Sequence, residues 1–504
     1  QLWAVTVAAD AIEHAGYDGE TKDIDRTKTG VVFANALGGE NRNLSNIRVW
    51  SEHTKQTAMT HGMPSSNAEA FVNDINVGTP RVDEDTMPGE LANVVSGRVA
   101  NLLDLQGPNH AMDAACASSM AAVLDACRLL QTRQVDVMLA GATDRTMDPA
   151  TFAKFSAIGA LSPSHSSPFD ARANGFVMGE GAGVLVLKRL SDAINSGDEI
   201  YSVIRGIGGS SDGRGKGITA PSQRGQIQAI ARAYNQAGYP ASSVELVEAH
   251  GTSTKVGDAT ELSTLSRLWT GVEGTGKVAV GSIKSQIGHL KAAAGIAGIM
   301  KTVMALHHRT IPPSANFENP NPTVDWTNIP FFVPTEAREW PRPSDNPRRA
   351  GVSAFGFGGT NFHIALEGYE PDVHRSLALE WEDRWNAYSH SSASGNDAPS
   401  IFDPSAKPTM THEELKAIEG GLLLLSASSV KGLASSLSEL TFGEPRFDSD
   451  PRGRRLSEAL QRASDAFDSS HQARMAIVAT SWAEFDKRTA LALKAMDDPE
   501  KWGF

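Results

Sequence analysis

Thiols are scarce in this sequence, which has only two cysteines, Cys116 and Cys127, among 504 residues. So few thiols in so long a chain exclude a disulfide scaffold and favour a reducing, cytoplasmic compartment. Long apolar runs are missing too, and without about 20 consecutive apolar residues we expect no membrane partner. The formal net charge is −13. Because phosphate contacts need a basic face, we do not expect nucleic acid as the main partner either.

An initiator methionine and a secretory leader are also absent at the start, where the chain opens on Gln1. We therefore expect a piece of a longer protein. What is present is ordinary for a globular chain, with 40% hydrophobic and 21% charged residues. At about 150 residues per domain, this length corresponds to about three domains.

The longest organised part runs over residues 1–368. Gly-punctuated apolar segments at 135–140 and 184–187 are typical of strands, and the Ala-rich residues 118–131 predict a helix. Such alternation favours an α/β fold, a sheet covered by helices.

The composition changes after Glu367, and polar residues dominate the next stretch, rich in Ser, Asp, Pro and His. We interpret residues 369–420 as a linker, because they show no apolar periodicity to bury. Residues 421–504 predict a second, smaller α/β subdomain without a catalytic motif. Its expected strands and helices are, in chain order, 422–425 (strand), 430–440 (helix), 475–479 (strand) and 481–496 (helix).

The first chemical motif surrounds Cys116, in the sequence Asp-Ala-Ala-Cys-Ala-Ser-Ser-Met at residues 113–120. Small neighbours permit a sharp turn into the helix that follows. A cysteine at a helix N-terminus sees positive dipole ends, which stabilise the thiolate and favour attack on a thioester near neutral pH. An inert buried cysteine is an equally good interpretation of Cys116 alone, and is our interpretation of Cys127 in mid-helix.

Two further motifs contain histidines. His250 follows an apolar strand and precedes Gly-Thr-Ser-Thr, which places it at a strand end facing a cleft. Lys284 and His289 stand five residues apart, and a run of small residues follows them. Each residue also has a non-functional interpretation. The histidines could be surface or hydrogen-bonded core residues, and Lys284 could be a solvated surface charge. The small-residue run is interpreted as close helix packing.

The fourth motif reads Ser-Ala-Phe-Gly-Phe-Gly-Gly-Thr-Asn at residues 353–361. Its glycines would let backbone N–H groups approach a ligand closely. A flexible turn is the plain alternative. A nucleotide-binding loop is disfavoured, because no phosphate-binding lysine follows and no GxGxxG pattern precedes a helix.

Together these four motifs, in this order, resemble the β-ketoacyl synthase family over residues 1–368. The resemblance implies a thiolase-like layered αβαβα fold. It also implies decarboxylative Claisen condensation between an acyl chain on a cysteine and a malonyl-type extender on acyl carrier protein. No bound cofactor or metal is implied, because the substrates are carried on phosphopantetheine. A homodimer and other domains of the same synthase are the implied partners.

The resemblance also assigns roles to the residues. Cys116 corresponds to the acyl-accepting nucleophile, and His250 and His289 to the pair that stabilises the enolate formed when carbon dioxide leaves. Lys284 corresponds to the charge that orders His289. The backbone N–H groups of Cys116 and Phe355 would form an oxyanion hole.

The remaining roles concern substrate access. Phe355, Gly356 and Phe357 resemble the family's gating loop. Thr252 and Thr254 match the hydroxyls that hold the phosphopantetheine arm. Ser253 stands between them where glycine is usual.

Three rivals come from other classes. A non-catalytic chain-length-factor-like subunit would lack the cysteine. A coenzyme A thiolase normally has a second catalytic cysteine near its C-terminal end, and none follows Cys127. Residues 209–213 fit the G-x-S-x-G pattern of serine hydrolases, but the glycines after them make a poor helix start.

Residues 87–98 and 206–213 are similar to synthases of multidomain enzymes, with the polyunsaturated-fatty-acid type as the nearest likeness. Residues 421–504 are similar to the linker subdomain that precedes an acyltransferase in such enzymes, and we expect the acyltransferase itself to be absent from this chain. The chain opens in what resembles a later helix, residues 2–16, so we expect that the family's first strand is missing or was not included.

Overall fold

The protein was analysed as a computed structural model, in which two compact units are distinguished, Gln1–Trp385 and Asn386–Phe504. The described residues are 1–17, 19, 22–214, 217–218, 220–272, 275–343, 346–392, 421–427, 434–435, 437, 473–479, 485, 488–490 and 492–493.

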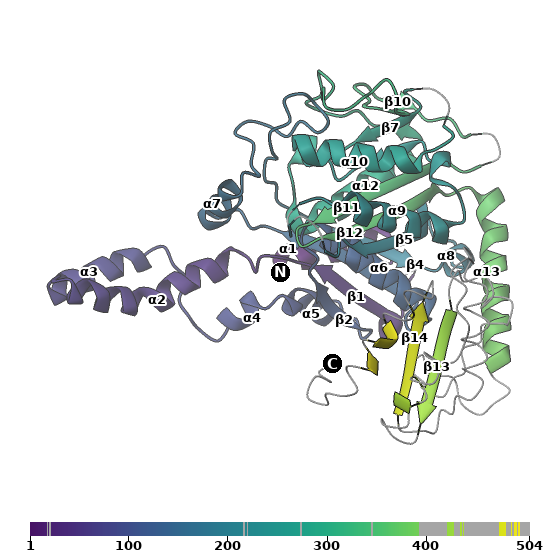
Figure 1. Cartoon of the computed structure of the whole chain (residues 1–504). Helices are drawn as coiled ribbons and strands as arrows, with labels where there is room; N and C mark the ends of the chain where they lie inside the picture. The colour runs from purple at the N-terminus through teal and green to yellow at the C-terminus, as the bar shows by residue number, and fades with distance from the viewer. Residues whose placement is uncertain are drawn as a thin grey trace. The chain divides into compact units, whose positions relative to one another are not determined.

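Two mixed sheets form the centre of the first unit (Figure 1). The first has the strand order β2-β1-β3-β4, with β4 antiparallel to the rest. The second has the order β5-β12-β11-β6-β7-β9, and β11 and β12 are an antiparallel hairpin. The bounds in the first sheet are β1 Thr29–Ala34, β2 Asn109–Met112, β3 Val137–Asp144 and β4 Gly181–Lys188. Those in the second are β5 Ser202–Ser211, β6 Leu246–Glu248, β7 Val278–Gly281, β9 Phe331–Phe332, β11 Arg349–Gly356 and β12 Thr360–Gly368.

Two helices, α6 (Ser118–Gln131) and α12 (Ala294–His307), lie between the sheets and share one apolar core with both. Small residues allow the close approach: a Cβ on Gly295 would lie 2.7 Å from the Ser119 hydroxyl oxygen. That hydroxyl accepts a hydrogen bond from the Ile296 N–H at 2.9 Å. The small-residue run therefore serves helix packing, as the sequence predicts.

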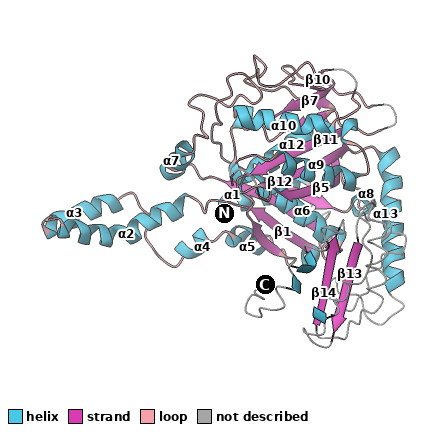
Figure 2. Ribbon diagram, viewed as in Figure 1, coloured by secondary structure: helices cyan, strands magenta, loops and turns pink. Residues whose placement is uncertain are grey.

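Helices also cover the outer face of each sheet (Figure 2). Helices α1 (Leu2–His14) and α5 (Asn93–Leu102) pack on the first sheet, and α9 (Gln223–Ala237) and α10 (Lys255–Leu268) on the second. A Cβ on Gly208 of β5 would lie 2.1 Å from a backbone oxygen of α9, so glycine is needed there. The five layers confirm the predicted αβαβα fold.

The hydrolase-like pattern has no nucleophile elbow. Its serine, Ser211, is the last residue of β5 and pairs with Thr360 of β12. The next helix, α9, begins only at Gln223. A nucleophile elbow requires a strand that turns directly into a helix, so the rejection of a serine hydrolase is confirmed.

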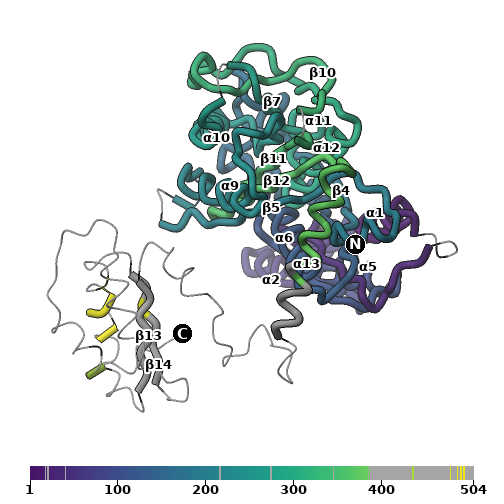
Figure 3. The backbone as a smooth tube through the Cα atoms, turned by 90° about the vertical axis from the view of Figure 1, so that its right-hand side faces the viewer, coloured from purple at the N-terminus to yellow at the C-terminus, as the bar shows by residue number. Residues whose placement is uncertain are grey.

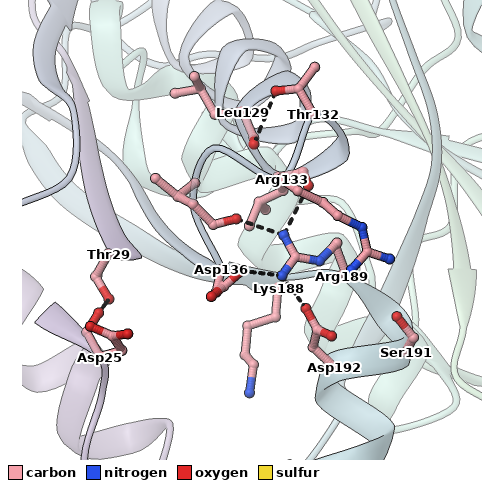
Figure 4. Close-up of polar contacts among 12 residues, drawn as sticks. Asp25, Thr29, Leu129, Thr132, Arg133, Asp136, Lys188, Arg189, Ser191 and Asp192 are labelled. Carbon is pink, nitrogen blue, oxygen red and sulfur yellow. Dashed lines mark hydrogen bonds and ion pairs between the residues drawn. The ribbon is translucent and has the colours of Figure 1, made fainter. Parts of the chain in front are cut away.

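The C-terminal end of α6 is held by Arg189, which follows β4 (Figure 4). Its guanidinium donates to the carbonyls of Leu130 at 3.0 Å and Val135 at 2.6 Å. Asp136 and Asp192 both pair with the same guanidinium. A cation at this end complements the helix dipole and satisfies carbonyls that would otherwise lack partners. The helix that begins beside Cys116 is thus fixed at its far end.

The other elements of the first unit lie between these layers or at their edges, and α2 and α3 form a helical hairpin that projects from the sheets (Figures 1 and 2). Their bounds are α2 Glu40–Thr60, α3 Ser65–Asn76, α4 Thr86–Glu90, α7 Pro149–Ala157, α8 Leu190–Asn195, α11 Lys284–Ile287, β8 Thr310–Ile311 and β10 Arg338–Glu339.

The start of the predicted linker, 369–420, is a helix, α13 (Pro371–Ser392). Its polar residues pair with residues distant in sequence, which a search for apolar periodicity cannot detect. His374 is fully buried. Arg133 donates to the Glu382 carboxylate at 2.6 and 2.7 Å. The rest of the predicted linker lies outside the described residues.

The second unit contains an antiparallel pair of strands, β13 (Gly421–Ala427) and β14 (Ala473–Ala479), visible in Figure 3. Both strands predicted there are confirmed. The predicted helices 430–440 and 481–496 lie mostly outside the described residues, although those described within them are helical. Across the part of the chain that the structure describes, no helix is long and apolar enough to cross a membrane.

Candidate active site

Cys116 lies in a tight turn between β2 and α6, as the small residues around it predict. The turn, Ala115–Ala117, is a short 3-10 helix, and Ala115 has a φ of +52°. The Ser118 hydroxyl accepts from the Ala114 N–H at 2.8 Å and donates to the Ala115 carbonyl at 2.6 Å. These bonds fix the strained backbone, and the Cys116 residue stays partly accessible.

The β11–β12 hairpin contacts this turn directly. The Thr360 hydroxyl donates to the Ala114 carbonyl at 3.1 Å. A Cβ on Gly356 would lie 2.3 Å from the same carbonyl oxygen, so only glycine fits there. Gly358 and Gly359 have φ values of +97° and +75°, a conformation that favours glycine. The glycines predicted to permit close backbone approach thus bring the loop against the cysteine.

The loop N–H that reaches the cysteine belongs to Phe357, not to Phe355. The Phe357 backbone N–H is among the groups that lower the pKa of the Cys116 thiol, whereas the Phe355 ring packs 5.6 Å from the His250 ring, centroid to centroid. The structure therefore differs from the sequence interpretation, which gave the N–H role to Phe355. Strand β11 ends at Gly356, so Phe357 is the first residue of the loop whose N–H lies beyond the strand.

Burial raises the pKa of the Cys116 thiol to about 11. The Lys284 charge and the Phe357 N–H lower that pKa but do not offset the loss of water. This shift runs against the expectation of a thiolate near neutral pH, because desolvation outweighs the Lys284 charge and the backbone N–H groups of Phe357 and Cys116. The free site holds a thiol, which must lose its proton during attack.

The rate of Cys116 alkylation by iodoacetamide is therefore expected to rise about tenfold per pH unit from pH 7 to 10, since only the thiolate reacts. Peptide mapping by mass spectrometry would follow the site. A rate that levels off near pH 7.5 would contradict the raised pKa. Cys127, whose burial raises its pKa to about 12, should react more slowly throughout.

His289 is held in one orientation by its own neighbourhood. Its backbone N–H donates to the Val177 carbonyl at 2.8 Å, and its carbonyl accepts from the Gly179 N–H at 3.0 Å. Its Nδ1 accepts from the Lys291 N–H at 3.0 Å. A neutral imidazole whose Nδ1 accepts must carry its proton on Nε2. The buried His289 ring therefore offers an Nε2–H donor.

His250 follows β6, and a buried carboxylate fixes its backbone. Glu261 of α10 accepts from the N–H groups of His250 and Gly251 at 2.8 and 2.9 Å. The Nδ1 atom of the His250 ring is buried and has no hydrogen-bond partner among the described residues. Buried polar atoms rarely lack a partner, so this nitrogen is a candidate contact for a bound molecule.

The two imidazoles lie together, with ring centroids 5.7 Å apart and an interplanar angle of 85°. Burial is the main reason that the pKa of each falls well below the usual value, and the Lys284 ammonium lowers both further. Both rings are therefore neutral at physiological pH. Lys284 is itself buried, so the alternative of a solvated surface lysine is excluded. Burial also lowers its pKa, while the Glu248 and Glu261 carboxylates oppose that shift.

Several residues around the site were missed by the sequence analysis. Glu261 and Asp258 stand three apart on α10, just after the His250 motif, and both are buried with pKa values raised to about 7, chiefly by burial. Lys291 is buried and pairs with Asp144 at 3.2 Å. The available signal was a pair of acids at helical spacing on one face, with an apolar stretch around them.

Thr252 and Thr254 come together, with their hydroxyl oxygens 3.3 Å apart. Ser253 between them has a φ of +60°, the conformation for which glycine is usual. Its buried hydroxyl accepts from the Ser167 N–H at 2.8 Å, and its carbonyl accepts from the Gly175 N–H at 2.7 Å. These bonds offset the strain of a serine at this position.

The site thus collects Cys116, His250, Lys284, His289 and the hairpin loop from both sheets. In the described part of the chain, no group of three or more His, Cys, Asp or Glu residues could hold a metal ion.

Three family models match the chain in succession. Residues 1–193 match the beta-ketoacyl synthase N-terminal domain, residues 201–318 its C-terminal domain, and residues 320–437 the ketoacyl-synthetase C-terminal extension. The chain belongs to the β-ketoacyl synthase family. The first two models contain every candidate site residue of this synthase except Phe355, Gly356 and Phe357, which fall in the third.

Among curated proteins, the synthase is 40% identical over 370 residues to a polyunsaturated fatty acid synthase component from Thraustochytrium. That match covers 72% of this chain and 13% of the relative, so the chain spans about an eighth of the relative's length.

Solved structures of ketosynthases are similar to this chain as well. The ketosynthase from module 6 of the bacillaene synthase of Bacillus subtilis is 28% identical with a TM-score of 0.61, over 98% of this chain and 73% of that one. A structure titled PfaC keto synthase-chain length factor is 31% identical with a TM-score of 0.64, over 73% of this chain and 38% of that one.

Proposed function

We propose that this β-ketoacyl synthase condenses an acyl thioester with a malonyl-type thioester, both delivered on acyl carrier protein. The observation that supports this most strongly is the shared site of Cys116 and two neutral imidazoles, with the Phe357 N–H among the groups that lower the pKa of the thiol. The cysteine supplies the nucleophile, and the N–H donors can stabilise the negative charges that develop on the thioester oxygens.

The first step loads the acyl chain. The Cys116 sulfur attacks the carbonyl of the incoming thioester, and its proton goes to the departing phosphopantetheine thiol. The N–H groups of Cys116 and Phe357 stabilise the oxyanion formed during this attack. The hydroxyls of Thr252 and Thr254 hold the phosphopantetheine arm.

The second step forms the new carbon–carbon bond. The malonyl thioester releases carbon dioxide, and the electron pair of the broken bond becomes an enolate. His289 donates its Nε2–H, and His250 a ring N–H, to the enolate oxygen, which is most effective in a site that excludes water. The carbanion then attacks the acyl carbonyl, and the Cys116 sulfur leaves as a thiolate, which takes up one proton from solvent to restore the thiol. Lys284 supports the step by keeping both imidazoles neutral.

The partners belong to the same proposal: acyl carrier protein as substrate, a second copy as a homodimer, and other domains of one synthase in the cytoplasm. A chain-length-factor-like subunit is the rival from a different class, because one structural relative is a PfaC keto synthase-chain length factor. The presence of Cys116 disfavours it, and the lack of a cysteine after Cys127 disfavours a thiolase.

The direct test supplies the purified chain with an acyl thioester and a malonyl thioester on acyl carrier protein. We expect a β-ketoacyl product and one carbon dioxide per product, measured by mass spectrometry and ¹⁴CO₂ release. No product from any acyl length tried would favour the chain-length factor. Product from two acetyl-coenzyme A molecules without carbon dioxide release would favour the thiolase.

A further inference from the structure

Behind the β11–β12 hairpin, three polar side chains form a buried hydrogen-bonded row. The Ser353 hydroxyl lies 2.9 Å from Nδ1 of His363, and the Tyr234 hydroxyl lies 2.9 Å from Nε2 of the same ring. All three residues are buried, with exposed fractions of 3%, 0% and 5% in the order Ser353, His363, Tyr234. None of the steps proposed for the reaction uses them.

A glycine on the neighbouring strand position leaves the space that this row occupies. Gly351 lies on β11, where a Cβ would lie 2.6 Å from the Tyr234 hydroxyl and 2.7 Å from Nε2 of His363. Any larger residue at Gly351 would push the imidazole and the phenol apart. The glycine is therefore an independent sign that the hydrogen bond between them is a built feature of the sheet.

The surroundings of the row are apolar. The Tyr234 ring packs on Trp269 with centroids 5.6 Å apart, inside the outer core of the second sheet. Burial lowers the pKa of His363 to about 3, so the ring is neutral at any working pH. A neutral imidazole has one donor and one acceptor, and both are used here. Such a satisfied network fixes geometry more strictly than apolar packing does.

The row is placed where it can control the loop. Ser353 and His363 face each other in the strand register, three residues before Gly356 and three after Thr360. Those two residues are the last pair before the loop, and both contact the Ala114 carbonyl. Tyr234 comes from α9, so the row ties both strands of the hairpin to the outer helix layer.

We propose that His363, bonded to Ser353 and Tyr234, is a positioning residue that holds the β11–β12 loop, and with it the Phe357 N–H, against the Cys116 turn. Without the row, the hairpin keeps its backbone pairing but loses the hydrogen bond that fixes it to α9. The loop then samples positions in which the Phe357 N–H points away from the sulfur. This inference rests on the proposed function for its catalytic consequence, but its geometric part concerns the thiol alone.

The test replaces Tyr234 by phenylalanine in the full chain, which removes one hydroxyl and keeps the ring against Trp269. We expect kcat for acyl transfer to Cys116 to fall on the order of tenfold with KM unchanged, because the oxyanion donor is misplaced. The iodoacetamide profile of Cys116 should move to higher pH, since the thiolate loses the Phe357 N–H. Ser353→Ala should do the same, and the double variant should be no worse than either single one.

Tyr239→Phe is the matched control. Tyr239 is also a buried tyrosine of this layer, but its hydroxyl bonds to the Leu366 carbonyl at 3.4 Å, far along β12 from the loop. We expect this variant to keep the parent kcat and alkylation profile, even if its melting temperature falls as much as that of Tyr234→Phe. If both variants lose stability equally and neither changes kcat or the alkylation profile, the row is structural only and the proposal is wrong.

The two readouts also separate this inference from the proposed function. Should the parent chain fail to transfer acyl groups, the proposed function fails, while the alkylation profiles still decide the positioning role. Should the parent transfer acyl groups and Tyr234→Phe behave like the parent in both readouts, only the positioning role fails.

Discussion

Cys116→Ser is expected to end covalent acyl loading and to reduce condensation to below about one-thousandth of the parent rate. A serine hydroxyl ionises far less readily than a thiol and is a poorer leaving group in the second step. Malonyl decarboxylation should persist, because the imidazoles that stabilise the enolate are intact. Mass spectrometry of the intact protein after incubation with an acyl thioester measures the loading.

The matched control for that variant is Cys127→Ser on the same helix. Cys127 packs against the core between the sheets, and its thiol has a pKa raised by burial to about 12. We expect this variant to load acyl groups as the parent does. An acyl thioester that still forms on Cys116→Ser, or that is lost in Cys127→Ser, would contradict the assignment of the nucleophile.

His289→Ala should reduce decarboxylation of a malonyl thioester by about 10²–10³, the usual effect of removing one oxyanion donor. Acyl loading should change much less, because the N–H groups of Cys116 and Phe357 act in that step. The measurement is ¹⁴CO₂ release beside the acyl-loading rate for one preparation. Circular dichroism during heating would show whether the variant folds.

His308→Ala serves as the control for the loss of a histidine. His308 lies at the end of α12 and is exposed. Decarboxylation at the parent rate is expected. If His289→Ala lowered loading and decarboxylation by the same factor, the imidazole would not be specific to the enolate step, and the assignment of its role would fail.

Local chemistry explains what could be predicted from the sequence. Helix α6 has the predicted bounds, 118–131, because an Ala-rich stretch begins after a turn of small residues and ends before Thr132. The motifs around Cys116, His250 and Lys284 could be recognised directly, because residue type and order are enough to identify these candidate site residues. The layered fold followed from alternating strands and helices.

What could not be predicted depends on contacts between distant segments. The choice of Phe357 over Phe355 is decided by where β11 ends against the Ala114 turn. The raised pKa of Cys116 depends on how much water the layers exclude. The position of Cys116 at a helix N-terminus, which the sequence does indicate, does not give that degree of burial. Helix α13 depends on partners such as Arg133, more than 200 positions away.

The central claim is that an acyl chain on Cys116 becomes part of a β-ketoacyl product. A chase experiment tests it most directly. The chain is loaded with a ¹³C-labelled acyl group, freed of donor and mixed with malonyl-acyl carrier protein. We predict that the label leaves the Cys116 peptide at the rate at which labelled β-ketoacyl product and carbon dioxide appear, one for one. Label that stays on Cys116 while carbon dioxide is released, or product that carries no label, would contradict the claim.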